Sequence, residues 1–365
     1  MTLSFYIARR FAGLVALIFA IFFGIMMLID IVDQLRRFSG GEIGLAEAAE
    51  LAAMNVPASL YRILPLILVM AAISLFLGLA RTSELVVVRA SGRSGLRFLM
   101  APVATALGIG ALAVAVLNPL VAATSKHYDT LSSRHARAGE SVLSIADTGL
   151  WLRQGGAEGQ TVVQAARSGQ GGTELFGVTF LTFDATGLPF VRIEADRALL
   201  VPGAWVLTGA RQWLLRDANP ERTATSPPDG TRLPSDLTSE RIRDSFGAPS
   251  AIPIWQLPSY IAGLEKAGFT AQGHRLWFQM ELALPLLLAA MVLIAAGFTM
   301  RHARFGGTGS MVMMALAGGF AIFFLRNFAQ VLGETGQIPI LLAAWTPPIA
   351  ALLTALGLLL HMEEG

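Results

Sequence analysis

The chain has 365 residues, of which 54% are hydrophobic and only 14% are charged, and its mean hydropathy is +0.60. These values exclude an ordinary soluble enzyme. The formal net charge is +2 and no block of Lys and Arg resembles a nucleic-acid-binding arm, so nucleic acid is not an expected partner. Cysteine is absent, which excludes disulfide bonds and thiolate metal sites.

Six long apolar runs lie along the chain, three before and three after a polar middle region. Each approaches or exceeds the roughly 20 residues that a helix needs to cross the hydrocarbon core of a bilayer. The sequence therefore predicts an α-helical membrane protein with six transmembrane helices in a 3+3 arrangement. The runs cover approximately residues 11–29, 63–80, 98–123, 282–300, 311–325 and 338–360.

Arginine is concentrated on one side of the predicted helix bundle. With six spans, this side holds both termini and the 81–97 and 301–308 loops, and both loops carry several Arg residues close to helix ends. The positive-inside rule assigns such a side to the cytoplasm. We therefore expect cytoplasmic termini, with the 36–59 connection and the middle region on the opposite side. In a bacterium that side is the periplasm or the exterior.

The middle region has the short alternating pattern of β-strands. Val191, Ile193 and Ala195 alternate with charged residues, which is typical of half-buried strands. We expect an inserted all-β domain, either a sandwich or jelly-roll-like, in which the run at 223–234 forms a flexible loop.

A short helix is expected between the β domain and the fourth span. Leu257, Ile261 and Leu264 are spaced as on one face of a helix, which predicts an amphipathic connector that docks on the membrane surface.

These patterns divide the chain into four parts. Residues 1–125 contain the first three transmembrane helices, with a cytoplasmic helix at about 83–92. Residues 126–250 form the β domain, and residues 251–271 form the amphipathic connector. Residues 272–365 contain the last three transmembrane helices.

The cytoplasmic segment between the second and third spans carries the most informative local signal. Ser83 can cap the start of a two-turn helix and Gly92 can end it, so that the apolar residues between them point at something other than lipid. Such a helix can insert into a groove on a partner protein, or it can merely turn the chain back towards the bilayer.

The chain lacks the G-x-x-x-x-G-K-[ST] loop that cradles nucleotide phosphates. If ATP drives this protein, another chain must hydrolyse it. The five histidines show no ligand spacing, and no Ser/His/Asp arrangement can be justified from the sequence. We therefore expect no catalytic residue, metal or cofactor in this chain.

Four charged residues lie near the outer ends of predicted spans, where a charge costs at least ~2.5 kcal/mol unless it finds a partner or water. They are Asp30, Asp33, Glu281 and Arg326. Asp30 or Asp33 can pair with Arg326, within the chain or across a dimer, or each charge can face water or extend outwards to the interface. The set indicates an amphiphilic cavity that opens outwards.

Arg36 and Arg37 lie where the first helix leaves the membrane on the outer side, against the positive-inside trend. Guanidinium groups bind phosphate in a bidentate manner, so the pair suits an anionic lipid head group. Simple interfacial anchoring is the alternative.

Several stretches resemble the LptF/LptG family, the permeases of the lipopolysaccharide-export ABC transporter. The resemblance covers essentially the whole chain, and its most specific part is the segment at 83–92 between the two halves of a 3+β+3 arrangement. Residues 32–37 and the Pro-rich start of the last helix are more like LptG than LptF, which remains the alternative within the family. The stretches are at 6–11, 31–37, 64–66, 83–92, 118–119, 284–286 and 344–347.

The resemblance implies a subunit of a bacterial (Gram-negative) inner-membrane transporter. Its partners would be an LptF-like permease, two copies of an LptB-like ATPase and an LptC-like subunit that receives lipopolysaccharide from a periplasmic β-jellyroll. The first and fifth helices would form lateral gates of a V-shaped cavity. A scaffold or mechanotransmission protein that does not transport is the alternative outside the family.

The resemblance also implies roles for particular residues. The coupling helix on the ATPase would contain Ser83, Glu84, Leu85, Val88 and Arg89.

At the outer side of the membrane, Arg36 and Arg37 match the basic end of the first helix that lies near lipid A phosphates in relatives. Some relatives carry Lys where Asp30 stands, so this chain would bind fewer phosphates there or pair Asp30 with Arg326.

Overall fold

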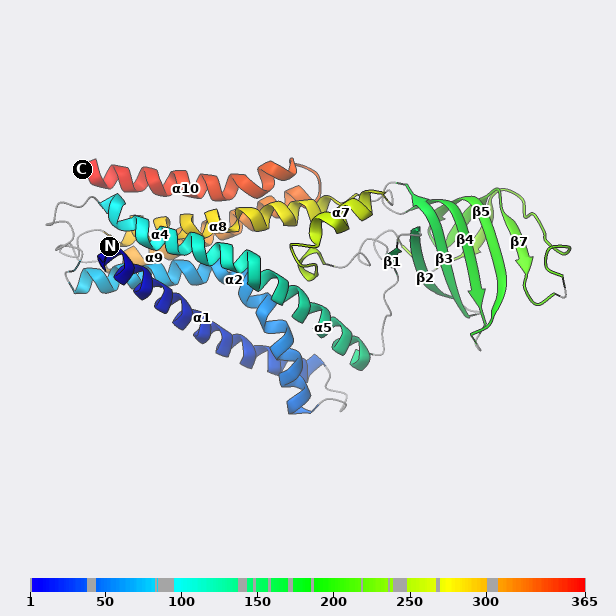
Figure 1. The fold of residues 1–365 in the computed structure, drawn as a ribbon, viewed down its shortest axis with the longest axis horizontal. Helices are drawn as coiled ribbons and strands as arrows, with labels where there is room; N and C mark the ends of the chain where they lie inside the picture. The colour runs from blue at the N-terminus through cyan, green and yellow to red at the C-terminus, as the bar shows by residue number, and fades with distance from the viewer. Residues whose placement is uncertain are drawn as a thin grey trace. The chain divides into compact units, whose positions relative to one another are not determined.

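The structure is a computed structural model in which the chain forms two compact units (Figure 1). One unit comprises Met1–Ala136, Pro249–Trp255 and Gln272–Gly365, and the other comprises Arg137–Ala248 and Gln256–Ala271. The structure describes residues 2–37, 44–82, 84, 95–136, 143–146, 149–156, 159–169, 173–184, 187–217, 219–235, 237–238, 248–266, 270–300 and 308–364.

The first unit is a bundle of long helices. Within the described residues, six helices are long and apolar enough to cross a membrane, which confirms the predicted 3+3 arrangement. Hydrocarbon cannot satisfy backbone polar groups, so a helix that crosses it satisfies them through its own hydrogen bonds. The helices are α1 (Thr2–Arg37), α2 (Leu45–Arg81), α4 (Gly95–Leu112) continuing into α5 (Asn118–Ala136), α8 (Gln272–Thr299), α9 (Thr308–Glu334) and α10 (Ile340–Glu364).

Helix α8 is the centre of this bundle and packs against α2, α4, α9 and α10. Its residues Leu288 and Met291 are completely buried. The crossing with α4 is close, because a Cβ atom added at Gly110 would lie 2.5 Å from the Cα atom of Pro285. Small residues at helix crossings are typical of membrane bundles, where van der Waals packing drives association.

The third span is longer than its apolar run and contains an irregular turn. Helix α4 passes through a π-helical turn at Ala113–Leu117 into α5, which continues to Ala136 and therefore beyond the expected domain boundary at residue 125. The indole Nε1 of Trp255 donates to the carbonyl oxygen of Ala115 at 3.4 Å. A partner outside the helix thus satisfies a carbonyl in the turn, where the regular helical ladder is interrupted.

The second unit contains an antiparallel sheet of eight strands, which confirms the inserted all-β domain. Strands β1 to β6 pair in chain order as a meander, while β7 pairs with β5 and β8 pairs with β6. A jelly roll contains two sheets joined by crossovers, whereas the described strands form a single sheet. They are β1 (Leu143–Ala146), β2 (Gly149–Gly156), β3 (Gly159–Ser168), β4 (Glu174–Phe183), β5 (Pro189–Val201), β6 (Ala204–Thr208), β7 (Arg211–Leu214) and β8 (Thr231–Pro234).

The predicted alternation in β5 is present, with Ile193 and Ala195 buried and Arg192 exposed. The expected flexible loop at 223–234 was partly wrong, because Thr231–Pro234 forms strand β8 against β6. The Pro and Asp residues of the 223–234 run favour a loop, but the hydrogen bonds between β8 and β6 outweigh that local preference.

The connection back to the bundle contains a 3-10 turn at Pro249–Ala251 and helix α7 at Leu257–Lys266. Leu257, Ile261 and Leu264 are buried on one side of α7, as their spacing predicted. The docking of this helix on a membrane surface stays a prediction.

Candidate functional site

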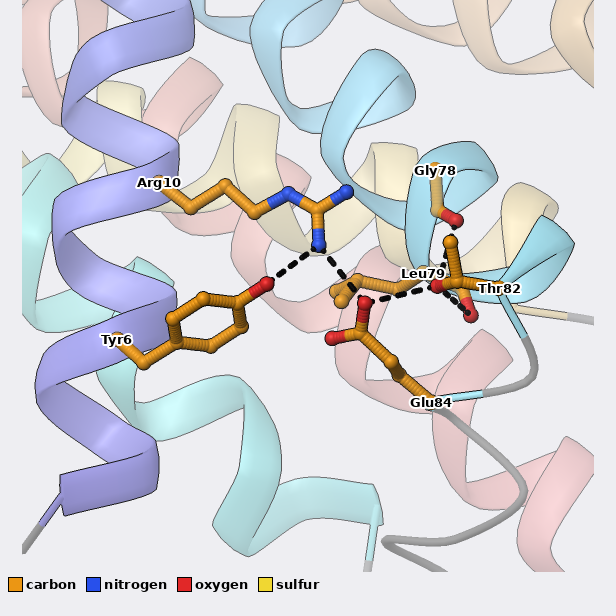
Figure 2. A network of polar contacts seen from close by, with 6 residues as sticks. All are labelled: Tyr6, Arg10, Gly78, Leu79, Thr82 and Glu84. Atoms are coloured by element: carbon orange, nitrogen blue, oxygen red, sulfur yellow. Dashed lines mark hydrogen bonds and ion pairs between the residues drawn. The ribbon is translucent and has the colours of Figure 1, made fainter.

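Within the predicted ATPase-coupling segment at 83–92, the structure describes Glu84 alone. The side chain of Glu84 contacts α1 and the end of α2 (Figure 2). Arg10 of α1 donates from Nη1 to Glu84 Oε1 at 3.1 Å and to the hydroxyl of Tyr6 at 3.0 Å. Thr82, which caps the end of α2, has its hydroxyl 2.9 Å from the same Glu84 oxygen and 3.1 Å from the carbonyl oxygen of Gly78. The side chain of Glu84 is therefore oriented from both α1 and α2.

The Arg10–Glu84 ion pair orients Glu84 rather than holding the fold together. Both side chains are about one third exposed, and such pairs contribute at most about 1 kcal/mol to stability. Glu84 Oε2 makes no hydrogen bond within the part of the chain that the structure describes. The other predicted coupling residues, Ser83, Leu85, Val88 and Arg89, lie outside the described residues.

The C-terminal end of α1 combines apolar and charged side chains along one open hollow. Leu28, Ile29 and Val32 line it together with Asp33 and Arg36. An acyl chain can contact the three apolar residues while a phosphate contacts the guanidinium group, so the lining matches the two parts of a phospholipid or glycolipid.

Arg37 lies differently from Arg36, although the same contact with a lipid head group is predicted for both residues. Its Nη1 donates to the hydroxyl of Tyr128 on α5 at 3.3 Å, and Gln34 donates to the same hydroxyl at 3.0 Å. Arg37 therefore helps to hold α1 against α5, while Arg36 lines the hollow.

Asp30 has a different partner from the one considered in the sequence. Its Oδ1 accepts a hydrogen bond from the side-chain amide of Asn55 on α2 at 2.8 Å. Within the described chain Arg326 instead interacts electrostatically with Glu281 and Tyr61. Asp30 and Arg326 therefore belong to different polar groups among the described residues.

Glu281 lies in the interior of the bundle and is only 1% exposed. Its Oε2 accepts a hydrogen bond from the hydroxyl of Tyr61 on α2, and the side chain of Asn118 on α5 lies beside both groups. The sequence pointed to Glu281 and Arg326 as charged residues but not to Tyr61, and it marked Asn118 only as part of the 118–119 stretch that resembles the family. No local pattern in the sequence indicates that Asn118 lies beside Glu281 or that Tyr61 binds it, because the three residues are far apart along the chain.

Metal chemistry has no support in the described part of the chain. No group of three or more His, Asp or Glu residues that could hold a metal ion occurs among the described residues. The polar groups above connect helices to one another.

Six membrane-spanning helices in two sets of three, with a β domain inserted between them, define a polytopic membrane protein with a folded extramembrane domain. The profile of the family described as "Lipopolysaccharide export system permease LptF/LptG" matches residues 5–361, so the chain belongs to this family.

Two relatives show how far the similarity extends. The chain is 27% identical over 338 residues to the lipopolysaccharide export system permease protein LptG of Escherichia coli (strain K12), covering 92% of this chain and 91% of that protein. It is 22% identical over 356 residues to the LptG protein of Haemophilus influenzae, covering 95% of each. The resemblance to LptG inferred from the sequence is therefore confirmed.

Proposed function

We propose that this chain is the LptG-type permease subunit of an inner-membrane transporter that extracts lipopolysaccharide and passes it to a periplasmic bridge. An LptF-like permease would complete the transmembrane pathway, and two LptB-like ATPase subunits would supply the energy. An LptC-like subunit would receive the lipid from the β domain. The main support is the family match over residues 5–361, which includes both halves of the bundle and the β domain.

The network around Glu84 supports a coupling role for the segment that begins there. The carboxylate is oriented by α1 and α2 through its Oε1 atom, and no described residue hydrogen-bonds to its Oε2 atom. In the proposed mechanism, closure of the ATPase pulls or pushes on this segment and the movement passes to the helices. The work of this chain is conformational, so the hydrolytic residues belong to the partner.

The exposed faces of α1 and α9 support a partner and a lipid beside them. Ile29 of α1 is 58% exposed, and Phe324 and Phe328 of α9 are 65% and 63% exposed. In a membrane these faces contact acyl chains or a second permease subunit. With the hollow beside Arg36, they support the assignment of α1 and α9 to the walls of a lipid cavity.

The test uses the complete complex reconstituted with lipopolysaccharide. Glu84→Ala should assemble at normal stoichiometry but lose lipid release, with ATP hydrolysis reduced or no longer linked to it. Unchanged ATP hydrolysis and lipid release in that variant would count against the coupling role. A complex that contains the chain but never binds or releases lipid would favour the scaffold alternative.

A further inference from the structure

The third span is interrupted at the turn Ala113–Leu117, and the sequence beside the turn gives the reason. Pro119 has no N–H group to donate to the carbonyl of Ala115, four residues earlier, and in a regular helix its ring would clash with that carbonyl. The chain widens there, because the N–H of Asn118 donates to the carbonyl of Ala113, five residues earlier, as in a π-helix. The proline thus marks the point where the third span can bend.

The two sides of this turn are held by different parts of the bundle. On the N-terminal side, α4 packs against α1 and α8, and Gly110 approaches Pro285 of α8 closely. On the C-terminal side, α5 packs against α2 and against the 3-10 turn at Pro249–Ala251. The bend between α4 and α5 therefore sets the position of α5 relative to α8.

The segment Pro249–Trp255 binds to the third span at two points beside the bend. The backbone N–H of Ile254 donates to Asn118 Oδ1 at 2.9 Å, and both residues are buried. The indole of Trp255 donates to the carbonyl of Ala115 at 3.4 Å. This is the carbonyl that the proline leaves without its usual donor, so the segment supplies from outside the helix the hydrogen bond that the helix cannot make.

The segment and α5 are the two places where the chain passes between the bundle and the second unit. Helix α5 ends at Ala136, directly before the second unit begins at Arg137, and Pro249 follows directly on Ala248 of that unit. Pro249 and Pro253 fix two φ angles in the segment, so it loses less conformational freedom on docking than a flexible segment would. The outgoing and returning connections are thus joined within the bundle by a pre-shaped segment.

We infer that the Pro249–Trp255 segment is a clamp that fixes the bend of the third span at the turn Ala113–Leu117. While the segment is docked, α5 and the returning connection move as one body. When the segment leaves the turn, the proline interruption becomes a hinge and α5 moves relative to α4 and α8. The clamp therefore decides whether the two connections to the β domain move together.

Two measurements on the full chain in lipid nanodiscs test the clamp. Hydrogen exchange at the Ile254 amide reports docking of the segment, and the distance between spin labels at Lys126→Cys on α5 and Leu282→Cys on α8 reports the bend. The chain has no cysteine of its own, so only these two exposed positions are labelled. Lys126 lies about 12 Å along α5 from Asn118, so a change of about 20° in the bend moves it by about 4 Å.

Release of the segment should change both quantities. Asn118→Ala removes the acceptor of the Ile254 N–H, and Trp255→Phe removes the indole donor while keeping an aromatic ring. Each should speed Ile254 exchange about two- to tenfold, as expected for the loss of one hydrogen bond. Each should also shift or broaden the label distance by about 4 Å.

A rescue variant tests whether Trp255 replaces the donor that Pro119 lacks. Pro119→Ala returns an N–H group to the position that serves the Ala115 carbonyl in a helix. In the Pro119→Ala background, Trp255→Phe should therefore leave the label distance unchanged, because the two changes act on one hydrogen bond.

Trp345→Phe is the matched control, because it removes an indole hydrogen bond to Gln279 at 3.1 Å that joins α10 to α8 and lies outside the third span. It should leave Ile254 exchange within about twofold of the unchanged protein and should not alter the label distance. If Trp345→Phe has the same effect as Trp255→Phe, the clamp is overturned, since general loosening of the bundle then explains both.

The clamp is also overturned if either the exchange rate or the label distance stays unchanged in both Asn118→Ala and Trp255→Phe. An effect of Trp255→Phe on the label distance that is equally large in the Pro119→Ala background would overturn it as well. The measurements need neither ATPase nor lipopolysaccharide, so this inference and the proposed function can fail separately.

Discussion

The crossing of α4 and α8 at Gly110 gives a prediction whose size follows from the structure. In Gly110→Ala the new methyl carbon would lie 2.5 Å from Pro285 Cα, 2.9 Å from its Cβ and 3.2 Å from its nitrogen. Non-bonded carbon atoms are most favourable at about 3.5 to 4.0 Å. The helices must therefore separate by roughly 1 Å, because the nearest atom is backbone and no change of rotamer moves it.

The cost of this overpacking is about 1 to 3 kcal/mol. Alanine also stabilises a helix by about 0.8 to 1.0 kcal/mol relative to glycine, which would hide part of the effect. Gly108→Ala is the matched control, since it lies in the same helix and its added Cβ would meet no atom within 4 Å. The gain in helix propensity is common to both variants, so their difference isolates the steric cost.

The assay is thermal unfolding of the full chain in one detergent, followed by fluorescence or by the loss of the monodisperse chromatographic peak. Gly110→Ala should unfold several degrees below Gly108→Ala, in keeping with the cost above. Equal unfolding temperatures for the two variants would refute the close approach of α4 and α8 at this level.

Three further predictions concern the polar groups. Arg10→Gln should lower lipid-coupled ATP hydrolysis of the complex severalfold while changing the free energy of unfolding by less than about 1 kcal/mol. Arg9 is an exposed neighbour, so Arg9→Gln should behave like the unchanged protein. Equal ATP hydrolysis in the two variants would show that Arg10 has no special role. Arg36→Gln should reduce crosslinking to lipopolysaccharide more than Arg37→Gln, since Arg36 lines the hollow while Arg37 contacts α5; the opposite order would contradict this assignment. Gln154→Leu should destabilise the β domain by about 1 to 3 kcal/mol, because the variant removes the acceptor of two hydrogen bonds. The loss should appear as unfolding at a lower temperature, followed by tryptophan fluorescence. An unchanged unfolding temperature would show that these hydrogen bonds do not stabilise the domain.

The helical and β parts of this chain could be predicted because each follows from a local rule. A single apolar segment in hydrocarbon can satisfy its backbone polar groups only as a helix. Long apolar runs, such as the one that forms α8, therefore identify the spans directly. Alternation with period two did the same for β5. The same rules failed at Thr231–Pro234, where a distant strand supplied the hydrogen bonds that local composition disfavoured.

The candidate site could be predicted only in part. The motif at 83–92 drew attention to Glu84, and hydropathy placed Asp30 and Arg326 at matching depths. Hydropathy gives the depth of a residue along its helix but not the direction in which its side chain points. That direction decides whether Arg326 faces Asp30 or Glu281.

The sequence by itself therefore determined that this is a six-span membrane protein with an inserted β domain, because bilayer thickness and strand alternation act on neighbouring residues. Only the tertiary structure decided which polar groups meet. Arg10 and Glu84 are 74 residues apart, and Tyr61 and Glu281 are 220 apart. Such contacts depend on how whole helices rotate and pack, and no local pattern records that.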